Sequence, residues 1–482
     1  MTKRFAIIGA GMSGILAAIK LREAGHENVR IFEKADEIGG TWRDNVYPGL
    51  NCDVPAHCYT YEFAPNPEWS ALNVSGPEIQ EYFKKVVADY NIRPLISFNA
   101  EVKRMVWSDG HWDMELSNGE SHHADIVIGA TGVLHHPRWP DIAGLDSFAG
   151  TAMHTARWDN SVDLSGKRIG IIGNGSTGVQ MATALGKAGH EIKHFQRSPQ
   201  WIMPIPAQEY SEAEKAAFRA DRAAIDAIRY DEEYWFRVRR FTTAIANPDS
   251  LEMAEIEDFC RSNLEQSVVD PILRAKLTPD YRAACKRLIY SPDYYQAAQL
   301  PNVETIVGEI ERIVPEGIVM EDGTLHEVDI LAIATGYHSD RFLRPIEIKG
   351  QNGADLEAAW AERCVAYYAI MIPDFPNLFM LNGPTSPVGN FSLIDIAEKQ
   401  WDYIEQLLAP LLTENAKAVT VTDEALATYE KKRVTAAKNS IFGSGCTSWY
   451  LDSTGVPITW PWDYQAFEDA MAKPELEAFE FS

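Results

Sequence analysis

Two glycine-rich segments of this sequence could bind the phosphates of dinucleotides. The first reads Gly-Ala-Gly-Met-Ser-Gly at 9–14, and the second reads Gly-Asn-Gly-Ser-Thr-Gly at 173–178. In such a turn the first glycine makes the bend, the second lets the backbone approach a pyrophosphate, and the third packs the helix on the strand. The N-terminus of that helix then binds the phosphate charge. One such motif is weak, but Ala-Gly-His-Glu follows each copy at the same spacing, at 24–27 and 188–191, so we predict two dinucleotide sites.

The residue after the second strand of each copy distinguishes the two sites. Glu33 stands there in the first copy, where a carboxylate accepts hydrogen bonds from an adenosine ribose. Arg197 falls at the same offset in the second copy, and a guanidinium suits a 2′-phosphate because it forms two charge-assisted hydrogen bonds. We therefore predict FAD at the first site and NADPH at the second. Phe32 and Phe195 do not align without a gap, which leaves open a one-residue difference in strand register, and the alternative for Arg197 is an exposed surface arginine.

Each glycine turn requires a strand before it and a helix after it. Short apolar runs predict buried parallel strands, and apolar residues at helical spacing predict the helices, which Gly25 and Gly189 then end. The expected strands are 5–8, 29–32, 169–172 and 192–195, and the expected helices include 15–21 and 179–185. A later strand in each unit ends in Ala-Thr-Gly, at 130–132 and 334–336. The fold class that we predict is α/β, with two Rossmann-like dinucleotide-binding domains.

The composition narrows the class of partner. The chain has 482 residues and a net charge of −25, which argues against nucleic-acid or anionic-membrane binding. No run of about 18 uncharged apolar residues is present, so we expect no transmembrane helix. The cysteines lack metal-ligand spacing and a chain of this length needs no disulfides, so we expect reduced thiols in the cytoplasm and no bound metal. These cysteines are Cys52, Cys58, Cys260, Cys285, Cys364 and Cys446.

The segment between the two units resembles a family fingerprint. Phe148, Gly150, His154, Trp158 and Asp159 fit the pattern FxGxxxHxxxW(P/D) of type I Baeyer–Villiger monooxygenases. Related N- and S-oxygenating flavin monooxygenases usually carry another residue at the position of Trp158. In the family this segment is thought to couple domain movement to cofactor position rather than to perform the chemistry.

The resemblance extends over nearly the whole chain. Segments 39–42, 47–49 and 52–53 look like the flavin-ring region of the family, and 285–287 and 293–295 look like its active-site segment. Residues 383–384 and 445–450 look like its C-terminal part, whereas 387–390 differ from the better-known cyclic-ketone enzymes and leave the substrate preference open. The resemblance implies an FAD-binding domain in two parts, 1–150 and 341–482. It also implies an NADP-binding domain at 151–340, with a helical insertion at about 207–284.

The chemistry of such enzymes depends on the cofactor. NADPH reduces FAD, dioxygen adds to give a peroxide, and the peroxide anion attacks a ketone, which becomes an ester or lactone. A fixed positive charge stabilises these anions, and an arginine suits this role because it stays protonated. By resemblance, Arg287 is the catalytic arginine and Asp53 is its partner. Lys286 matches a lysine that contacts the 2′-phosphate together with Arg197, and Trp449 matches a tryptophan near the nicotinamide.

The cofactor-binding residues that we expect come from all of these segments. They are Gly9, Gly11, Ser13, Gly14, Glu33, Lys34, Gly40, Thr41, Trp42, Asp53, Tyr59, Val102, Ala130, Thr131, Gly132, Gly173, Gly175, Ser176, Thr177, Gly178, Gln180, Arg197, Ser198, Lys286 and Trp449.

Three other functions compete with ketone oxygenation. A disulfide reductase also pairs FAD with NADPH, but Trp42 stands where its redox cysteine would be. An N- or S-oxygenase needs no catalytic arginine and is the main alternative, and sulfides are candidate substrates beside ketones. A flavin-dependent sensor without catalysis would have no use for Lys286, Arg287 and Asp53 together.

Overall fold

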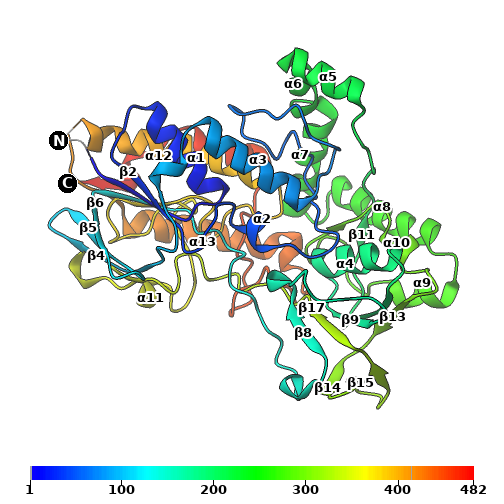
Figure 1. Cartoon of the computed structure of the whole chain (residues 1–482). Helices are drawn as coiled ribbons and strands as arrows, with labels where there is room; N and C mark the ends of the chain where they lie inside the picture. Colours follow the sequence, from blue (N-terminus) through cyan, green and yellow to red (C-terminus); the bar gives the residue numbers. More distant parts are fainter. Residues whose placement is uncertain (1–2, 414) are drawn as a thin grey trace.

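The computed structural model describes residues 3–413 and 415–482. Its first sheet has the strand order β19-β7-β1-β2-β3, and every pair in it is parallel (Figure 1). The strands are β1 (Phe5–Ile8), β2 (Val29–Phe32), β3 (Ile96–Ser97), β7 (Ile126–Gly129) and β19 (Leu378–Met380). Because β19 comes from the last quarter of the chain, this sheet is built from two separate parts of the sequence.

Both faces of the first sheet are buried, which explains its apolar runs. Phe5 and Ile7 contribute to a core that includes residues of α1 (Met12–Glu23), α3 (Gly76–Asp89) and α12 (Leu393–Leu412). Ala6 and Ile8 point to the opposite face, where they join a core under the antiparallel sheet β18-β4-β5-β6. That sheet consists of β4 (Val102–Ser108), β5 (His111–Leu116), β6 (Ser121–Ala124) and β18 (Glu347–Lys349).

The second parallel sheet has the order β13-β10-β9-β17-β8. Its strands are β8 (Thr151–His154), β9 (Arg168–Ile172), β10 (Glu191–Gln196), β13 (Val303–Val307) and β17 (Ile330–Ile333). Helix α4 (Ser176–Lys187) follows β9, and α10 (Tyr294–Ala297) packs against α4. The chain therefore contains two parallel α/β units, which confirms the predicted fold class. The residue boundaries of the predicted domains remain a prediction.

The expected ends of the glycine-turn helices are also seen. Gly25 and Gly189 have φ angles of 85° and 88°, a backbone conformation that glycine adopts without strain. The amide of His26 donates to the carbonyl of Leu21, and that of His190 to Leu185, which closes both helices in the same way.

In the sequence, a helical insertion lies between strands β10 and β13 of the second sheet. It comprises α5 (Glu212–Ala220), α6 (Arg222–Arg229), α7 (Glu232–Ala246), α8 (Leu251–Ser267) and α9 (Pro271–Leu277). Each begins after a serine or aspartate whose side chain accepts a backbone N–H, as in an N-cap. Phe218 and Ile225, from α5 and α6, are buried in the core of the first unit. The insertion thus covers the first unit as well as the second (Figure 1).

Three smaller pairings and four further helices complete the described fold. Strands β14 (Ile310–Val314), β15 (Gly317–Met320) and β16 (Leu325–Glu327) form an antiparallel sheet, and β20 (Val419–Val421) pairs with β21 (Phe479–Phe481). Strands β11 (Ile202–Met203) and β12 (Ile289–Tyr290) are parallel. The helices are α2 (Thr41–Asp44), α11 (Leu356–Ala359), α13 (Asp423–Asn439) and α14 (Tyr464–Ala472).

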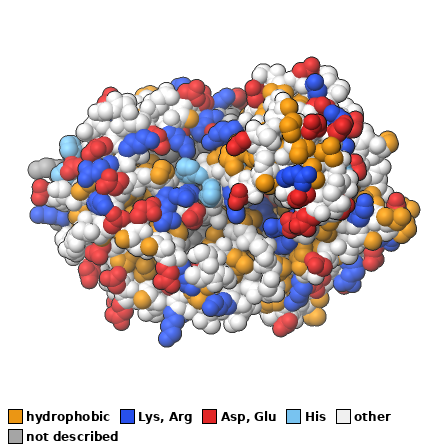
Figure 2. Space-filling view, turned by 90° about the horizontal axis from the view of Figure 1, so that it is seen from below, with side chains coloured by type: hydrophobic (Ala, Val, Ile, Leu, Met, Phe, Trp, Pro, Cys, Tyr) orange, Lys and Arg blue, Asp and Glu red, His pale blue; other side chains and the backbone are white. Residues whose placement is uncertain are grey.

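The surface carries interspersed charges of both signs. Figure 2 shows acidic and basic side chains mixed on one face, with hydrophobic side chains gathered towards the side that carries the insertion. Exposed large hydrophobic residues of α8, α9 and the segment between them include Leu251, Phe259, Val269 and Ile272. Among the helices that the structure describes, none is both long enough and apolar enough to cross a membrane.

Candidate active site

One cavity of about 1830 Å³ lies between the two parallel units. Both glycine turns, the segment 52–55, the insertion and the segment 447–449 line its wall. All the predicted catalytic and cofactor-binding residues contribute to this wall except Gly14 and Gly178. A Cβ atom on either of these two glycines would lie 1.9 Å from the carbonyl oxygen of Gly9 or Gly173, so they pack helix against strand behind the turn.

The first glycine turn is shaped by close backbone approaches. Gly9 has a φ of 102°, and a Cβ atom there would lie 2.7 Å from the carbonyl oxygen of Ala130. A Cβ atom on Gly40 would lie 3.4 Å from the Cα of Gly11, so side chains at these positions would narrow the cavity. The carboxylate of Glu33 is buried and accepts a 2.8 Å hydrogen bond from the amide of Ala10. Its Oε1 accepts hydrogen bonds from the amide of Ala35 at 2.9 Å and from Nη1 of Arg43 at 3.0 Å, so protein partners hold in place a carboxylate that lines the cavity.

The second glycine turn leaves an unsatisfied polar group. Gly173 has a φ of 109°, and a Cβ atom there would lie 2.5 Å from the carbonyl oxygen of Ala334. Ser176 begins α4 and lines the cavity, and its buried hydroxyl has no hydrogen-bond partner among the described residues. Such an orphaned donor at the N-terminus of a 12-residue helix fits a phosphate oxygen.

The hydrogen-bond register shows that the two glycine-turn units differ in length by one residue. Ile8 pairs with Phe32 in the first sheet, and Ile172 pairs with Phe195 in the second, so Glu33 corresponds to Gln196. The one-residue difference in register that the alignment had left open is therefore present, because β10 reaches the turn one residue sooner than β2. Gln196 is buried, and its Oε1 accepts a 3.0 Å hydrogen bond from Asn174.

Two cations lie together beside the second turn. The ammonium of Lys286 donates to the hydroxyl of Ser198 at 3.0 Å and lies 4.1 Å from the ring centre of Tyr281. Arg197 is more exposed, and its nearest acidic contact, Glu309, is 4.0 Å away. Burial and the neighbouring Arg197 together lower the pKa of Lys286. An anion bound between these cations would relieve their repulsion, so the pair suits a phosphate.

An arginine–aspartate pair lies in the cavity wall. Nη2 of Arg287 donates to Oδ2 of Asp53 at 2.8 Å, and both side chains are about three-quarters buried, with 28% and 21% exposed. Tyr450 lies beside the guanidinium. Burial alone would disfavour the charged form, but the carboxylate of Asp53 and the neighbouring Tyr450 raise the pKa of Arg287. The guanidinium is thus a permanent positive charge in the wall of the cavity.

A glycine permits this arrangement. Gly389 has a φ of 83°, and a Cβ atom there would lie 2.2 Å from the Tyr450 hydroxyl and 2.6 Å from Nη1 of Arg287. Tyr450 and Gly389 were not among the predicted site residues. Gly389 lies in the stretch 387–390, where the sequence departs from the better-known cyclic-ketone enzymes, and Tyr450 directly follows Trp449.

A family model matches the first part of the chain, and two relatives match nearly all of it. Residues 6–234 match the family model described as pyridine nucleotide-disulphide oxidoreductase. An uncharacterized monooxygenase of Mycobacterium tuberculosis is 42% identical over 456 residues, which is 95% of this chain and 91% of that protein. A Baeyer-Villiger monooxygenase of Streptomyces coelicolor is 35% identical over 482 residues, or 99% of this chain and 92% of that protein.

The fold comparison gives the same family. The crystal structure of OTEMO complexed with FAD and NADP has a TM-score of 0.88 and 25% sequence identity, covering 100% of this chain and 99% of that one. The chain belongs to the Baeyer–Villiger monooxygenase family. The resemblance that the fingerprint indicated is confirmed.

The disulphide oxidoreductase model matches the nucleotide-binding framework of this Baeyer–Villiger family member. The position that would hold a redox cysteine in such a reductase is Trp42 here, and its Nε1 donates to the Tyr59 hydroxyl at 3.2 Å. The Mycobacterium and Streptomyces relatives, which match 95% and 99% of the chain, are both named monooxygenases.

The fingerprint of this Baeyer–Villiger family member joins the two units. His154 ends β8 at the edge of the second sheet, is 1% exposed, and accepts a 3.1 Å hydrogen bond from the amide of Ala156 through Nδ1. Burial lowers its pKa. Its ring lies near that of Tyr337, whose hydroxyl donates to Oδ1 of Asn45 in the first unit at 2.7 Å. These contacts place His154 in a structural connection between the units.

Other predicted cofactor-binding side chains of this Baeyer–Villiger family member already have protein partners. The amide of Gln180 accepts from Tyr47 at 2.9 Å and donates to the carbonyl of Asn51 at 2.9 Å, so it connects α4 to the first unit. The hydroxyl of Ser13 accepts a 3.0 Å hydrogen bond from Asn382, a residue that no motif had singled out. Their roles towards a cofactor remain predictions.

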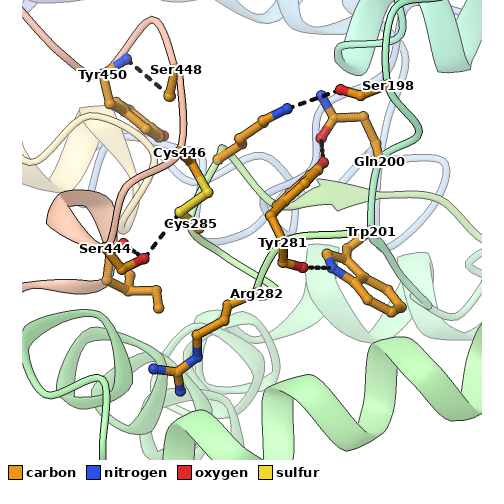
Figure 3. The surroundings of a disulfide bond; sticks show 12 residues. Ser198, Gln200, Trp201, Tyr281, Arg282, Cys285, Ser444, Cys446, Ser448 and Tyr450 are labelled. Atoms are coloured by element: carbon orange, nitrogen blue, oxygen red, sulfur yellow. Dashed lines mark hydrogen bonds between the residues drawn. A yellow bond between two sulfur atoms is a disulfide. The ribbon is translucent and has the colours of Figure 1, made fainter. Parts of the chain in front are cut away.

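The thiol prediction was wrong for two cysteines of this Baeyer–Villiger family member. Cys285 and Cys446 form a disulfide with a Cα–Cα distance of 6.0 Å (Figure 3). Cys52, Cys58, Cys260 and Cys364 are free in the described part of the chain. The two bonded residues are 161 apart in sequence, so only the folded chain brings them together.

Proposed function

We propose that this chain is an FAD-dependent, NADPH-consuming monooxygenase that inserts one oxygen atom from dioxygen into a ketone. In the balanced reaction, ketone, dioxygen, NADPH and one proton give an ester or lactone, water and NADP⁺. The observation that carries the proposal is the Arg287–Asp53 pair in the cavity wall that both glycine turns share. The names of the Streptomyces relative and of the FAD- and NADP-bound structure support it.

The two glycine turns have separate tasks in this proposal. The first turn, with Gly11, Gly40 and Glu33, would hold FAD, and the second turn, with the orphaned hydroxyl of Ser176, would hold NADPH. Lys286 and Arg197 would bind the 2′-phosphate between them. FAD, when bound, supplies the acceptance of hydride from NADPH and the activation of dioxygen.

Arg287 would stabilise the negative charge that develops on oxygen as the ketone reacts. Its guanidinium offers several donors in a fixed plane, and Asp53 holds that plane in position. The partial burial of Arg287 and Asp53 strengthens this interaction relative to one at a fully exposed surface. Arg287 is therefore assigned the catalytic role, and Asp53 acts through it as a positioning residue.

The ketone would bind against the apolar part of the same cavity. Phe236, Phe241 and Ile256, from α7 and α8, line it, as does Val388, the neighbour of Gly389 in the sequence. Such a wall binds the hydrocarbon part of a substrate and excludes water from the reacting carbonyl.

The test uses the purified protein loaded with FAD. NADPH consumption is followed with linear, cyclic and aryl ketones and with one sulfide, and products are analysed after reaction under ¹⁸O₂. The proposal expects an ester or lactone that carries one ¹⁸O atom from at least one class of ketone. Sulfoxide formation without ester from any ketone would instead establish an S-oxygenase.

A further inference from the structure

The disulfide joins the two segments that carry the residues of the active-site wall. Cys285 directly precedes Lys286 and Arg287, and Cys446 precedes the cavity-lining residues 447–449 (Figure 3). The Cα–Cα distance of 6.0 Å lies in the ordinary range for disulfides. A second contact between the same segments is made where Tyr450 lies beside Arg287. The bond therefore ties the catalytic segment to the loop that covers part of the cavity.

Few backbone hydrogen bonds hold the middle of this loop. Residues 444–450 form no helix or strand, and within the described chain no backbone amide from 445 to 449 donates to a backbone carbonyl. The other links are the hydroxyl of Ser339, which donates to the carbonyl of Trp449 at 3.3 Å, and the packing of Trp449 and Tyr450 against a hydrophobic cluster. The hydroxyl of Ser448 accepts only from the nearby amide of Tyr450, at 3.2 Å. Without the disulfide, residues 445–449 would keep few bonds to the rest of the fold.

The two cysteine residues of the disulfide also differ in their exposure to solvent. Cys285 is 1% exposed, whereas Cys446 is partly exposed and stands between the exposed residues Gly445 and Thr447. A small oxidant or reductant from solution can reach Cys446 first. Cys285 then lies in position to complete the exchange.

We propose that Cys285 and Cys446 are a reversible redox pair that fastens the loop 444–450 over the cavity when oxidised and releases it when reduced. The effect on NADPH rests on the proposed function, because the loop covers the cavity to which NADPH is assigned. In a reducing compartment a disulfide is expected to be transient and regulatory rather than structural.

Hydrogen peroxide is the oxidant that the proposal names. A monooxygenase that reduces dioxygen without transferring oxygen to a substrate releases it. The sulfur of Cys446 attacks one peroxide oxygen, so an S–O bond forms, the O–O bond breaks and water leaves after protonation. The sulfur of Cys285 then displaces the second oxygen as water and forms the S–S bond. Two thiols thus lose two electrons and two protons, and one peroxide becomes two water molecules.

The reverse step requires a cellular thiol such as glutathione. Its thiolate attacks Cys446, a mixed disulfide forms, and a second thiolate completes the reduction. Peroxide released by the enzyme would thus form the disulfide and fix the loop, and reduction by a cellular thiol would release the loop again.

The other cysteines are poor competitors for the same oxidant. Burial raises the pKa of both Cys58 and Cys260 to about 12, which keeps them as unreactive thiols near neutral pH. Burial also raises the pKa of Cys52 and Cys364. Oxidation is therefore expected at the Cys285–Cys446 pair alone.

The first test maps thiols without any substrate. The holoenzyme is incubated with dithiothreitol, with glutathione buffers of graded potential, or with hydrogen peroxide, then alkylated and analysed by peptide mass spectrometry. Cys285 and Cys446 are expected to gain and lose the label together, while the four other cysteines keep one state throughout. The proposal is overturned if both residues stay alkylatable after peroxide treatment, or if dithiothreitol cannot reduce the bond.

The second test measures the loop. Hydrogen exchange of a peptide spanning 444–451 is expected to accelerate on reduction, and peroxide is expected to restore the slow rate. If the released loop covers the cavity for only a third to a tenth of the time, the KM for NADPH in flavin reduction rises about three- to tenfold. Cys446→Ser is expected to show the reduced behaviour in every buffer, whereas Cys364→Ser is expected to respond as the wild type does.

These readouts separate the two proposals. Thiol mapping, hydrogen exchange and flavin reduction need no ketone, so a failure to form ester would leave the redox pair standing. Equal exchange rates and equal KM values in the oxidised and reduced enzyme would remove the redox pair and leave the proposed reaction untouched.

Discussion

Oδ2 of Asp53 accepts a 2.8 Å hydrogen bond from Nη2 of Arg287, a residue 234 positions further along the chain. The bond joins the segment after the first glycine turn to the segment after the helical insertion. Neither residue belongs to a helix or strand, so their position depends on the packing of both units. The backbone of Gly389 closes the other side of the guanidinium.

Replacement of this arginine tests the proposed chemistry. Arg287→Ala should retain FAD and remain reducible by NADPH, but it should lose ester formation by about 10²–10³-fold, the usual cost of removing a group that stabilises developing charge. Reducing equivalents should then appear as hydrogen peroxide. The measurement combines stopped-flow flavin reduction with ester and peroxide assays.

Arg287→Lys is the matched control for charge. It should not restore full activity, because an ammonium cannot reproduce the planar set of donors that Asp53 orients. Normal ester yield from Arg287→Ala would remove the Baeyer–Villiger assignment and favour N- or S-oxygenation.

Sequence patterns were sufficient where local physics determines structure. The apolar run at 5–8 is strand β1, whose four residues are all buried, and the segment 29–32 is strand β2, in which Arg30 alone is exposed. Gly25 and Gly189 end their helices because few other residues adopt a positive φ at low cost.

Other features depend on contacts between distant segments. The correspondence between Glu33 and Gln196 is set by the hydrogen-bond register of the strands, which cannot be predicted from the residue types alone. The Cys285–Cys446 bond and the place of Tyr450 follow from how the C-terminal loop folds back on the insertion. The hydrogen bond from Asn382 to Ser13 could not be predicted either, because the two residues are 369 positions apart in the sequence.

Selectivity for NADPH should depend on the two cations at the second turn. A charge-assisted hydrogen bond contributes about 1.5–3 kcal/mol, so Arg197→Ala and Lys286→Ala should each raise the KM for NADPH roughly ten- to a hundredfold. The KM for NADH should change little, because NADH lacks the 2′-phosphate. Steady-state kinetics with both cofactors measures the effect.

The structure sharpens the comparison between these two variants. Lys286 is held by Ser198 and Tyr281, whereas the side chain of Arg197 is 67% exposed, so Lys286→Ala should cost at least as much as Arg197→Ala. Lys167→Ala removes an exposed lysine of the same unit and serves as the control. Equal losses with NADPH and NADH would show that neither cation contacts the 2′-phosphate.

His154 should act by position and not by proton transfer. Burial lowers its pKa below 6.5, so the imidazole is neutral at pH 7 and links β8 to the segment after it. His154→Ala should raise the KM for NADPH and lower the yield of product per NADPH. The pH–rate profile between pH 6 and 8 should keep its shape, whereas loss of its main ionisation in this variant alone would identify a general acid or base.

The same shift predicts how stability depends on pH. Because the folded protein binds a proton at His154 less readily than the unfolded chain, this residue contributes stability above pH 6.5 that is lost as the pH falls through the folded pKa. His154→Gln, which cannot titrate, should lose less stability than the wild type between pH 7 and pH 5. Thermal unfolding at a series of pH values measures this difference.

The register of β10 predicts that the side chain of Gln196 lies near the adenosine ribose of the nicotinamide cofactor, and substitution of Gln196 tests this. Gln196 occupies the place of Glu33 and is 1% exposed, and its amide accepts from Asn174 and donates to the Tyr294 hydroxyl at 2.6 Å. A carboxylate can accept hydrogen bonds from Asn174 and Tyr294, but it cannot donate to Nδ1 of His194, which lies 3.1 Å from Nε2 of Gln196. Thermal unfolding of Gln196→Glu therefore accompanies the kinetics and checks that the variant is folded. It would also accept from a ribose hydroxyl and repel a 2′-phosphate. The variant should therefore raise the KM for NADPH and lower that for NADH, and their ratio should shift by about tenfold for each 1.4 kcal/mol of difference. Gln299→Glu adds the same charge to an exposed position of the same unit and should leave the ratio unchanged. An unaltered preference for NADPH in Gln196→Glu would mean that this side chain does not face the adenosine ribose, and the correspondence with Glu33 would then be one of backbone register alone.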